Sequence, residues 1–549
     1  MRYNMKPVSA SIVFSVSGKE HTCDLLKDEI KEFFSIETDL SDEGCKITLD
    51  PKNAVEISSL KIDFPYQFDE KDSIFMNGYQ SWTVTKEYSI DTTNLIVEQV
   101  ARLMKNRKAD PAGDRNFTHY PKLNRWLHGV SYGYIRNEKA FRFFGSLNEK
   151  DGFTFFDIDT EKGLLSVRKD FAGKTFDSAF TAFDLVFLNG TEAEVFDGYF
   201  EKLGVESTKA HPLTGYTTWY RHQQDISEKK ILADLNTLCE QKHKYNCQLF
   251  CIDEGYETHI GDWLSLRKIP FPHGMQPITS KIMSSSMSAG IWIAPFICDR
   301  RSRLYREHPD WILRDADGKP VLACRSFHTC YCLDTTNEEF LHHLKNILVT
   351  MRDDWGISVF KFDFLYAACA APSSGKTRGE KMFDAVRFLK ECVGDSTTIG
   401  CGVPLLAAAG IFDYCQVGCD YSPDWYPPLV HAGREQNSTY RAVLDTIYHR
   451  QLAGRAFTLF NTVTPITDTH FLFSREKRDL LVKIHGLTGG MVLTSDDVSK
   501  YNSDDQILWN TLHSFRQATV TDVYTKDRNL VIEYTLYDQP RILKIALLE

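Results

Sequence analysis

The stretch Val359-Phe-Lys-Phe-Asp-Phe-Leu365 places two charged side chains inside an apolar run. Because side chains alternate along a β-strand, the three phenylalanines, Phe364 included, are expected on one face and Lys361 and Asp363 on the other. Charged groups on the inner face of a buried strand are costly unless they pair or take part in chemistry. This stretch alone is compatible with a plain buried ion pair and with a functional pair.

Length and composition narrow the class of protein. The 549 residues are enough for two to four domains, and 42% hydrophobic with 25% charged residues is typical of soluble globular proteins. The net charge of -10 and the lack of a basic run argue against nucleic acid or an anionic membrane as partner. The first residues do not resemble a signal peptide, and no apolar run reaches the roughly 18 residues of a membrane-spanning helix.

The 14 cysteines are scattered, and several stand in apolar, strand-like runs. This pattern favours buried, reduced thiols and a cytoplasmic location. Cys324, Cys330 and Cys332 lie near His308 and His328, which raises the alternative of a zinc site. No CxxC pair is present and the spacing fits no structural zinc pattern well, so we expect no metal there.

The first 205 residues are expected to form a β-sandwich. Short strand-forming runs recur there, separated by turn signals such as Asn189-Gly190. Within this domain, the segment Asn77-Gly-Tyr-Gln-Ser-Trp82 combines a turn signal with aromatic and polar residues. It is either a hairpin tip with a packed tryptophan or a loop that lends Trp82 to a neighbouring pocket.

Residues 206–500 alternate between strand-like runs and helical stretches, which predicts a (β/α)8 barrel. The eight expected strands are 216–220, 249–253, 290–295, 359–363, 397–401, 414–418, 456–461 and 490–495, and helices are expected near 227–244, 275–288, 376–393 and 434–453. A doubly wound sheet is the competing arrangement, but no GxGxxG follows any of these strands. Residues 501–549 are expected to form a small C-terminal antiparallel β-domain, with strands at 530–536 and 541–546.

The acidic residues give the barrel a direction. Asp253, Asp363 and Asp420 each stand at the C-terminal end of an expected strand, and these ends meet on the face of the barrel that carries active sites. Structural acids would also be spread over the helix surfaces. Together with Lys361 and Trp292, the three acids favour a functional site.

On these residues the chain resembles glycoside hydrolase family 36, the retaining, melibiase-like α-galactosidases. The matching motifs run in order along nearly the whole length: 77–82 (Asn-Gly-Tyr-Gln-Ser-Trp), 252–256 (Ile-Asp-Glu-Gly-Tyr), 261–263 (Gly-Asp-Trp), 290–295 (Gly-Ile-Trp-Ile-Ala-Pro), 302–311 (Ser-Arg-Leu-Tyr-Arg-Glu-His-Pro-Asp-Trp), 361–363 (Lys-Phe-Asp) and 400–404 (Gly-Cys-Gly-Val-Pro). The resemblance implies an exo-α-glycosidase that releases terminal α-galactose from short oligosaccharides.

The resemblance also implies roles for single residues. Asp363 would be the nucleophile and Asp420 the general acid/base, and the Lys361 charge is expected to keep Asp363 ionised. The substrate-binding residues would be Asp253, Glu254, Trp292, Lys361, Cys401, Gln416, Trp219 and Trp82. Among these, Asp253 and Lys361 would bind sugar hydroxyls and the tryptophans would wall the sugar.

Two positions depart from the family pattern, which usually has a second aspartate at Glu254 and an arginine at Gln416. The longer acid and the lost guanidinium both affect sugar recognition, and they leave the catalytic pair intact. An α-N-acetylgalactosaminide or another α-glycoside therefore stays open as substrate, as does transfer to a sugar acceptor in place of water. A catalytically inactive sugar-binding protein is a further alternative. The family tends to form oligomers, so the Trp82 loop serves either its own pocket or a partner's.

Overall fold

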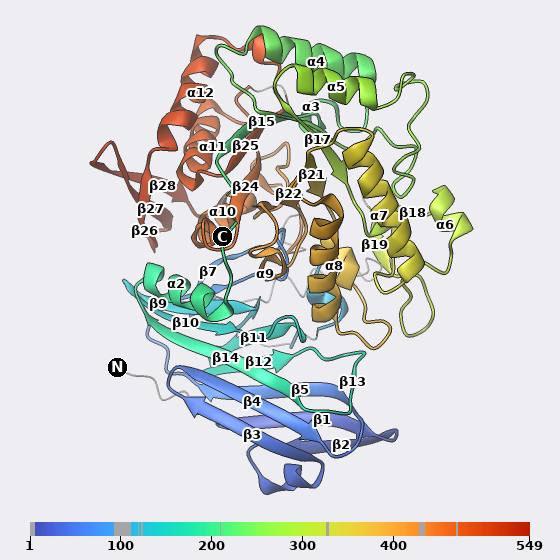
Figure 1. Ribbon diagram of the computed structural model, residues 1–549. Helices are drawn as coiled ribbons and strands as arrows, with labels where there is room; N and C mark the ends of the chain where they lie inside the picture. Colours follow the sequence, from blue (N-terminus) through green and yellow to red (C-terminus); the bar gives the residue numbers. More distant parts are fainter. Residues whose placement is uncertain are drawn as a thin grey trace.

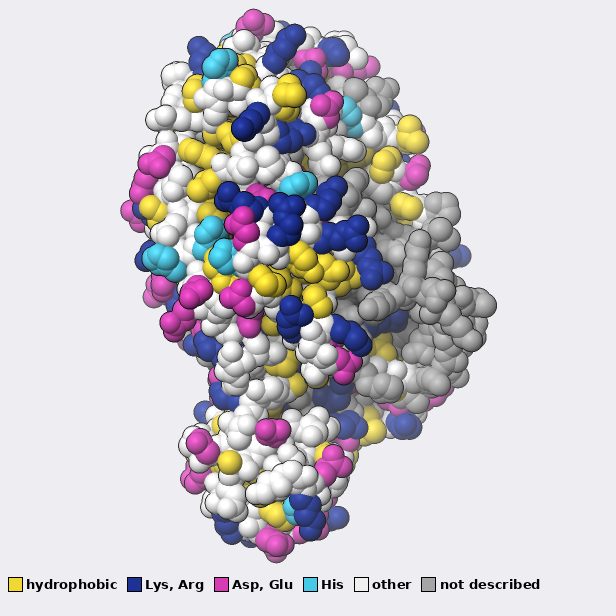
Figure 2. Space-filling view, turned by 90° about the vertical axis from the view of Figure 1, so that its right-hand side faces the viewer, with side chains coloured by type: hydrophobic (Ala, Val, Ile, Leu, Met, Phe, Trp, Pro, Cys, Tyr) yellow, Lys and Arg dark blue, Asp and Glu magenta, His cyan; other side chains and the backbone are white. Residues whose placement is uncertain are grey.

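The computed structural model describes residues 6–92, 111–118, 120–121, 125–208, 210–325, 329–427, 434–467 and 470–548. The N-terminal β-sheets lie at one end of the molecule and the barrel lies at the other (Figure 1). In space-filling view the molecule narrows toward its lower end, where Figure 1 has the first strands of the chain (Figure 2). Lys and Arg side chains gather in the middle of this face, beside hydrophobic ones.

The predicted N-terminal sandwich is present as two seven-stranded sheets. One sheet contains β1 (Ser9–Val16), β2 (Lys19–Asp24), β5 (Val55–Pro65), β8 (Trp126–Val130), β11 (Thr154–Asp159), β12 (Leu164–Lys169) and β13 (Thr175–Phe176). The other contains β3 (Phe34–Ser41), β4 (Gly44–Pro51), β6 (Ser73–Met76), β7 (Lys86–Ser89), β9 (Tyr132–Asn137), β10 (Ala140–Ser146) and β14 (Phe180–Gly190). Strand β4 shows why they stack: Cys45, Ile47 and Leu49 alternate with more exposed residues and enter the shared core.

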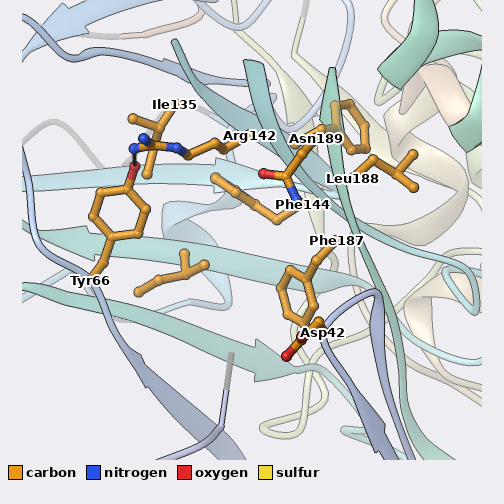
Figure 3. Close-up of a pocket in the computed structure, with 10 residues that line it drawn as sticks. Asp42, Tyr66, Ile135, Arg142, Phe144, Phe187, Leu188 and Asn189 are labelled. Carbon is orange, nitrogen blue, oxygen red and sulfur yellow. Dashed lines mark hydrogen bonds between the residues drawn. The ribbon is translucent and has the colours of Figure 1, made fainter. Parts of the chain in front are cut away.

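A pocket opens within this sandwich (Figure 3). Side chains from both sheets line it, including Phe144, Leu165 and Phe187, and Arg142 Nη1 donates a 2.6 Å hydrogen bond to the Tyr66 hydroxyl. It contains none of the residues expected in the functional site, so it is separate from the site described below.

Helix α2 (Glu192–Leu203) connects the sandwich to the barrel. A capping box between Thr191 and Glu194 begins it, and Gly204 ends it in the left-handed conformation at φ 65°. Its apolar face packs on the second sheet, where Phe196 meets Phe143 edge-on with ring centroids 5.3 Å apart. This packing fixes where the barrel begins.

The predicted barrel is confirmed: a closed parallel sheet runs in chain order from β15 to β25. Its strands are β15 (Leu213–Thr217), β16 (Leu249–Ile252), β17 (Ser288–Ile293), β21 (Val359–Phe362), β22 (Thr397–Gly400), β23 (Tyr414–Gln416), β24 (Thr458–Val463) and β25 (Met491–Thr494). The first strand, predicted at 216–220, is present but lies earlier in the chain, because Trp219 already begins helix α3 (Trp219–His222). Gly215 is fixed inside β15, since an added Cβ would lie 2.8 Å from Leu493 and 2.9 Å from Leu249. The close packing at Gly215 sets the position of β15 in the barrel, so the strand ends at Thr217 although the residues after it have a high strand propensity.

Helices cover the barrel strands on the outside (Figure 1). The predicted ones are α4 (Glu228–Glu240), α5 (Gln276–Ser284), α8 (Arg378–Val393) and α10 (Thr439–Tyr448). The sequence analysis missed α7 (Glu338–Asp353) and α11 (Arg475–Thr488), although each begins with a side-chain N-cap, Asn337 and Ser474 respectively. Helix α10 is shorter than the predicted 434–453: residues 434–438 are not helical, and the Ser438 side chain caps its start by accepting from the Arg441 N–H.

The C-terminal segment contains more secondary structure than predicted. Helix α12 (Ser503–Phe515) precedes three antiparallel strands, β26 (Thr519–Lys526), β27 (Asn529–Leu536) and β28 (Gln539–Ala546), where two strands were predicted. Signals for the helix were present, because Asn502 and Asp505 form a capping box and the buried Leu508, Leu512 and Phe515 follow at helical spacing. Within the described part of the chain, no helix is long and apolar enough to cross a membrane.

Candidate active site

The end of β21 holds the residues from which the sequence analysis began. Lys361 points into the barrel, as predicted, and the strand ends at Phe362. Phe364 leaves the strand in the left-handed conformation at φ 54°, so the prediction that it shares a strand face with the other phenylalanines is wrong. Between them, Asp363 is fixed by its backbone N–H, which donates to the Ile293 carbonyl at 2.9 Å.

The Asp363 carboxylate is held by two neutral donors. Trp292 Nε1 donates to Oδ2 at 2.9 Å, and the Phe364 backbone N–H donates to Oδ1 at 2.8 Å. Burial raises the pKa of Asp363 to about 6, even though the Lys361 charge and the Trp292 hydrogen bond lower it, and the Asp420 charge adds to the increase. Asp363 is therefore mostly ionised at neutral pH, with less margin than the sequence analysis expected.

Lys361 pairs with a different aspartate. Its Nζ lies 2.9 Å from Asp253 Oδ2, and the two residues are only 9% and 2% exposed. Burial alone would lower the pKa of Lys361, but the Asp253 carboxylate raises it well above its usual value. Thr217 Oγ1 also donates to Asp253 Oδ2 at 3.2 Å, so this carboxylate is held by a full charge and a hydroxyl.

Glu254 is turned toward a neighbouring loop. Its Oε1 accepts a 2.7 Å hydrogen bond from Gln224 Nε2, while its backbone N–H donates to Asp253 Oδ1 at 3.0 Å. Close by, burial and then the Glu254 charge raise the pKa of Glu257 to about 7. The extra methylene of Glu254 is thus accommodated by a partner on the loop after α3.

Asp420 lies in the loop after β23, four residues beyond Gln416. Gln416 Nε2 donates to Asp420 Oδ1 at 3.1 Å and to the Gly418 carbonyl at 2.9 Å. Thr462 Oγ1 lies 3.5 Å from the same carboxylate oxygen, and the Tyr220 hydroxyl lies 3.1 Å from that threonine. The predicted pair Gln416 and Asp420 is therefore in direct contact.

The Trp82 loop of the sandwich reaches the barrel of its own chain. Ser81 N–H donates to the Val403 carbonyl at 2.9 Å, and the Trp82 ring meets Phe364 edge-on at 5.3 Å. An added Cβ on Gly402, which has φ 59°, would lie 3.0 Å from the same ring. The segment is the tip of the β6–β7 hairpin, as in the first alternative, and its Trp82 ring packs on barrel residues beside Asp363.

The remaining predicted residues lie on the same end of the barrel. Cys401 follows β22 and is fully buried, and burial followed by the Asp363 charge raises its pKa well above the usual value. Trp219 begins α3 directly after β15 and is half-buried. The structure thus brings Asp253, Lys361, Trp292 and Asp363 into one chain of contacts, with the other predicted residues around it.

Sequence reasoning missed several contributors to the site. Tyr220 was hidden in the run assigned to the first strand, and its pKa is raised well above the usual value by burial and by Asp420. Thr217 and Thr462 carry no local signal, since each acts through contacts with residues far along the chain. Among the described residues, no group of three or more His, Cys, Asp or Glu side chains is placed to hold a metal ion. His328, part of the zinc alternative, lies outside those residues.

Comparison with known proteins agrees with this geometry. Residues 207–389 match the family model called Melibiase. The matched residues include the first four strands of the barrel, β15, β16, β17 and β21. Alpha-galactosidase 2 from Pediococcus pentosaceus is 27% identical over 153 residues, which are 27% of this chain and 20% of that protein. The A type blood alpha-D-galactosamine galactosaminidase of Flavonifractor plautii is 25% identical over 272 residues, 40% of this chain and 24% of that protein.

These alignments cover about a fifth to a quarter of the relatives' length. The fold similarity extends further. TtGalA, an alpha-galactosidase from Thermus thermophilus, superposes with a TM-score of 0.72 at 23% identity, over 96% of this chain and 98% of that one. The similar fold therefore includes the parts outside the barrel.

Proposed function

We propose that the protein is a retaining exo-α-galactosidase that releases terminal α-galactose from short oligosaccharides. The observation that carries the proposal is the placement of Asp363 and Asp420 after β21 and β23 of one barrel, beside the buried Asp253–Lys361 pair. The residues that match the Melibiase model, 207–389, include the strands that precede Asp253 and Asp363. TtGalA was solved with p-nitrophenyl alpha-D-galactopyranoside and with stachyose, which supports an α-galactoside as ligand of this fold.

The proposed reaction is a double displacement. Asp363 attacks the anomeric carbon while Asp420 gives its proton to the leaving oxygen, and a glycosyl ester forms on Asp363. Asp420, now a carboxylate, takes a proton from water, which attacks the ester and releases the sugar. Two carboxylates supply both nucleophile and proton, so the steps require neither a metal nor an organic cofactor.

The remaining residues fit separate tasks in this scheme. Trp292 Nε1 fixes the orientation of Asp363 and stabilises its negative charge through the 2.9 Å hydrogen bond. The Asp253–Lys361 pair offers an acceptor and a donor to sugar hydroxyls without bringing a net charge into the pocket. Trp82 adds an aromatic wall from the sandwich domain.

Hydrolysis of a panel of aryl α-glycosides tests the proposal. The panel contains galactoside, N-acetylgalactosaminide, glucoside, xyloside, arabinopyranoside and fucoside, with Asp363→Ala and Asp420→Ala as matched controls. We expect turnover of the galactoside that is lost in both variants. Turnover of another sugar alone would show that Glu254 and Gln416 have changed the specificity, and no turnover by a folded protein would overturn the hydrolase.

The stereochemical course is tested separately. Proton NMR during the first minutes of hydrolysis should show the α-anomer of the released sugar before mutarotation produces the β-anomer. If the β-anomer appears first, the enzyme is inverting and Asp363 is not a nucleophile. Repeating the experiment with a sugar acceptor separates hydrolysis from transfer.

Cellular context belongs to the same proposal. The described cysteines are all free thiols, which supports a cytoplasmic enzyme acting on imported oligosaccharides. Fractionation of the source cells tests this location, and activity confined to secreted material would contradict it. Association into a homo-oligomer is tested by light scattering of the purified chain.

A further inference from the structure

A small sheet beside the site carries two cysteines in opposite positions. It consists of β18 (Ile297–Asp299), β20 (Cys330–Cys332) and β19 (Leu322–Cys324), and follows β17 in the chain (Figure 1). In the antiparallel pairing of β19 with β20, Cys324 stands directly opposite Cys330. The proposed hydrolysis does not use this pair, and among the described residues it belongs to no group of side chains placed to hold a metal ion.

The register brings the two thiols within the reach of a disulfide. Directly opposite residues of an antiparallel pair have Cα atoms about 4.5–5.5 Å apart, and disulfides join Cα atoms about 4.4–6.8 Å apart. Opposite side chains also lie on the same face of the sheet. Both cysteines are free thiols in the structure, and the Cys324 side chain is the main cause of the raised pKa of Cys330.

The two thiols differ in accessibility. Cys330 is fully buried, whereas Cys324 is half-buried and borders solvent. The neighbouring Cys324 side chain, together with burial, raises the pKa of Cys330, which therefore stays protonated until it reacts. An incoming reagent thus meets Cys324 first, and Cys330 is placed to react second.

We propose that Cys324 and Cys330 form a redox modification site that closes to a reversible disulfide by exchange with a low-molecular-weight disulfide such as oxidised glutathione. The Cys324 thiolate attacks the reagent's S–S bond, forming a mixed disulfide and releasing one thiolate. Cys330 then gives up its proton and attacks the Cys324 sulfur, which releases the second thiolate. The protein dithiol loses two electrons and two protons, and the reagent gains them as two thiols.

The contacts of β19 connect this site to the candidate active site. The register of β19 shifts between Leu322 and Cys324, so Ala323 lies in a bulge. The Ala323 carbonyl accepts a 2.8 Å hydrogen bond from the Tyr366 hydroxyl, and Tyr366 packs edge-on against Trp82 at 5.7 Å. A covalent link at Cys324 therefore acts on the bulge that supports the Trp82 wall.

Peptide mapping tests the disulfide directly. Trypsin cuts after Arg325, and Lys319 is protected by Pro320, so the two cysteines fall in the separate peptides 315–325 and 326–345. After equilibration of the full-length protein with oxidised glutathione and alkylation of free thiols, we expect these peptides to be recovered as one linked species that dithiothreitol separates. Cys324→Ser should abolish the link, while Cys332→Ser, in the same peptide as Cys330, should leave it intact.

Two results would overturn the site: glutathione retained on Cys324 without a link to Cys330, or a link between the two peptides that persists in Cys330→Ser and is lost in Cys332→Ser. These readouts are masses, so they stand even if the protein hydrolyses no α-galactoside. A circular dichroism spectrum of each variant shows that it is folded.

The connection to the pocket rests on the proposed function and has its own measurement. We expect the KM for an aryl α-galactoside to differ at least about twofold between the oxidised and reduced protein, an effect of the size produced by small shifts in a binding wall. In Tyr366→Phe, which lacks the hydroxyl that reaches Ala323, the link should form with no change in KM between the two states. Equal KM values in the linked and reduced wild type would contradict the connection.

Discussion

An aspartate follows each of β16 and β21 at the same end of the barrel, and the two carboxylates have different hydrogen-bond donors. Asp253 receives an ammonium group at 2.9 Å and a threonine hydroxyl at 3.2 Å. Asp363 receives only neutral N–H donors, from Trp292 at 2.9 Å and from the Phe364 backbone at 2.8 Å. One carboxylate is thus neutralised by a full charge and the other is stabilised by dipoles.

This difference supports the separate roles proposed for the two aspartates, sugar binding for Asp253 and nucleophilic attack for Asp363. A carboxylate in a close ion pair is a poor nucleophile, because the ammonium competes for its electron pairs. A buried carboxylate held by neutral donors keeps its reactivity, at the cost of a pKa of about 6 that leaves it close to protonation. The single lysine of β21 therefore stabilises its neighbour on β16 more directly than the aspartate two positions along its own strand.

The largest effect should come from Asp363→Asn. The variant lacks the proposed nucleophile, so we expect kcat to fall at least about 10³-fold. Its stability should change in the opposite direction, because a carboxyl with a raised pKa in the folded state costs stability once pH exceeds that pKa. At pH 7.5 the variant should be more stable by on the order of 1–3 kcal/mol, and this gain should disappear as pH falls from about 6 to 4.

Urea unfolding at pH 7.5 and at pH 4.5 measures the predicted change in stability. Asp253→Asn is the matched control, since it removes the other strand-end carboxylate and leaves Lys361 buried without its counterion. We expect this control to be less stable than the wild type at pH 7.5. If both variants were stabilised equally, the two carboxylates would not differ as described.

Lys361→Met should give the next largest effect. The methionine keeps much of the side-chain volume but leaves Asp253 buried without its counterion, which typically costs about 3–5 kcal/mol. We also expect kcat/KM to fall about 10²-fold, because the pocket loses a donor and Asp363 loses a nearby positive charge. Thermal unfolding and initial rates measure the two effects.

The double variant Asp253→Asn/Lys361→Met sharpens the comparison. It replaces both charges, so most of the lost stability should return while activity stays low. A double variant as unstable as Lys361→Met alone would mean that the lysine stabilises the fold through packing and not through Asp253.

Features that depend on neighbouring residues could be predicted from the sequence, and features that depend on residues far apart in the chain could not. The barrel strands were predictable because apolar runs and strand-end acids recur along the chain, and Lys361 was correctly placed on the inner face by simple alternation. The partner of Lys361 was not predictable, since Asp253 lies 108 positions away and the nearer Asp363 offered a simpler pairing. Tertiary contacts of this kind also decided Thr462 at φ 60°, for which the local sequence carries no signal.

The pH dependence of kcat/KM reports on the Trp292 donor. In the wild type the acid limb should have its midpoint at about pH 6, because the free enzyme needs Asp363 ionised. Trp292→Phe keeps an aromatic wall and removes the N–H that lowers the pKa of Asp363, so the midpoint should move up by about half a unit to one unit. An unchanged midpoint with reduced activity would show that the indole acts on the sugar and not on the carboxylate.

The smallest effect on activity is expected at the end of β23, where the neutral amide of Gln416 donates a hydrogen bond to the Asp420 carboxylate. Gln416→Met keeps the length of the side chain and removes the amide that donates to Asp420 at 3.1 Å and to the Gly418 carbonyl at 2.9 Å. The loss of one such hydrogen bond is worth about 1 kcal/mol, so kcat/KM should fall roughly three- to tenfold.

Gln416→Glu is the contrasting variant, because a second carboxylate beside Asp420 raises the pKa of the pair and should move the basic limb of the pH profile of kcat/KM upward. If Gln416→Glu lowered activity without moving that limb, the residue would act through the shape of the loop, and the resemblance between Gln416–Asp420 and Trp292–Asp363 would be geometric only.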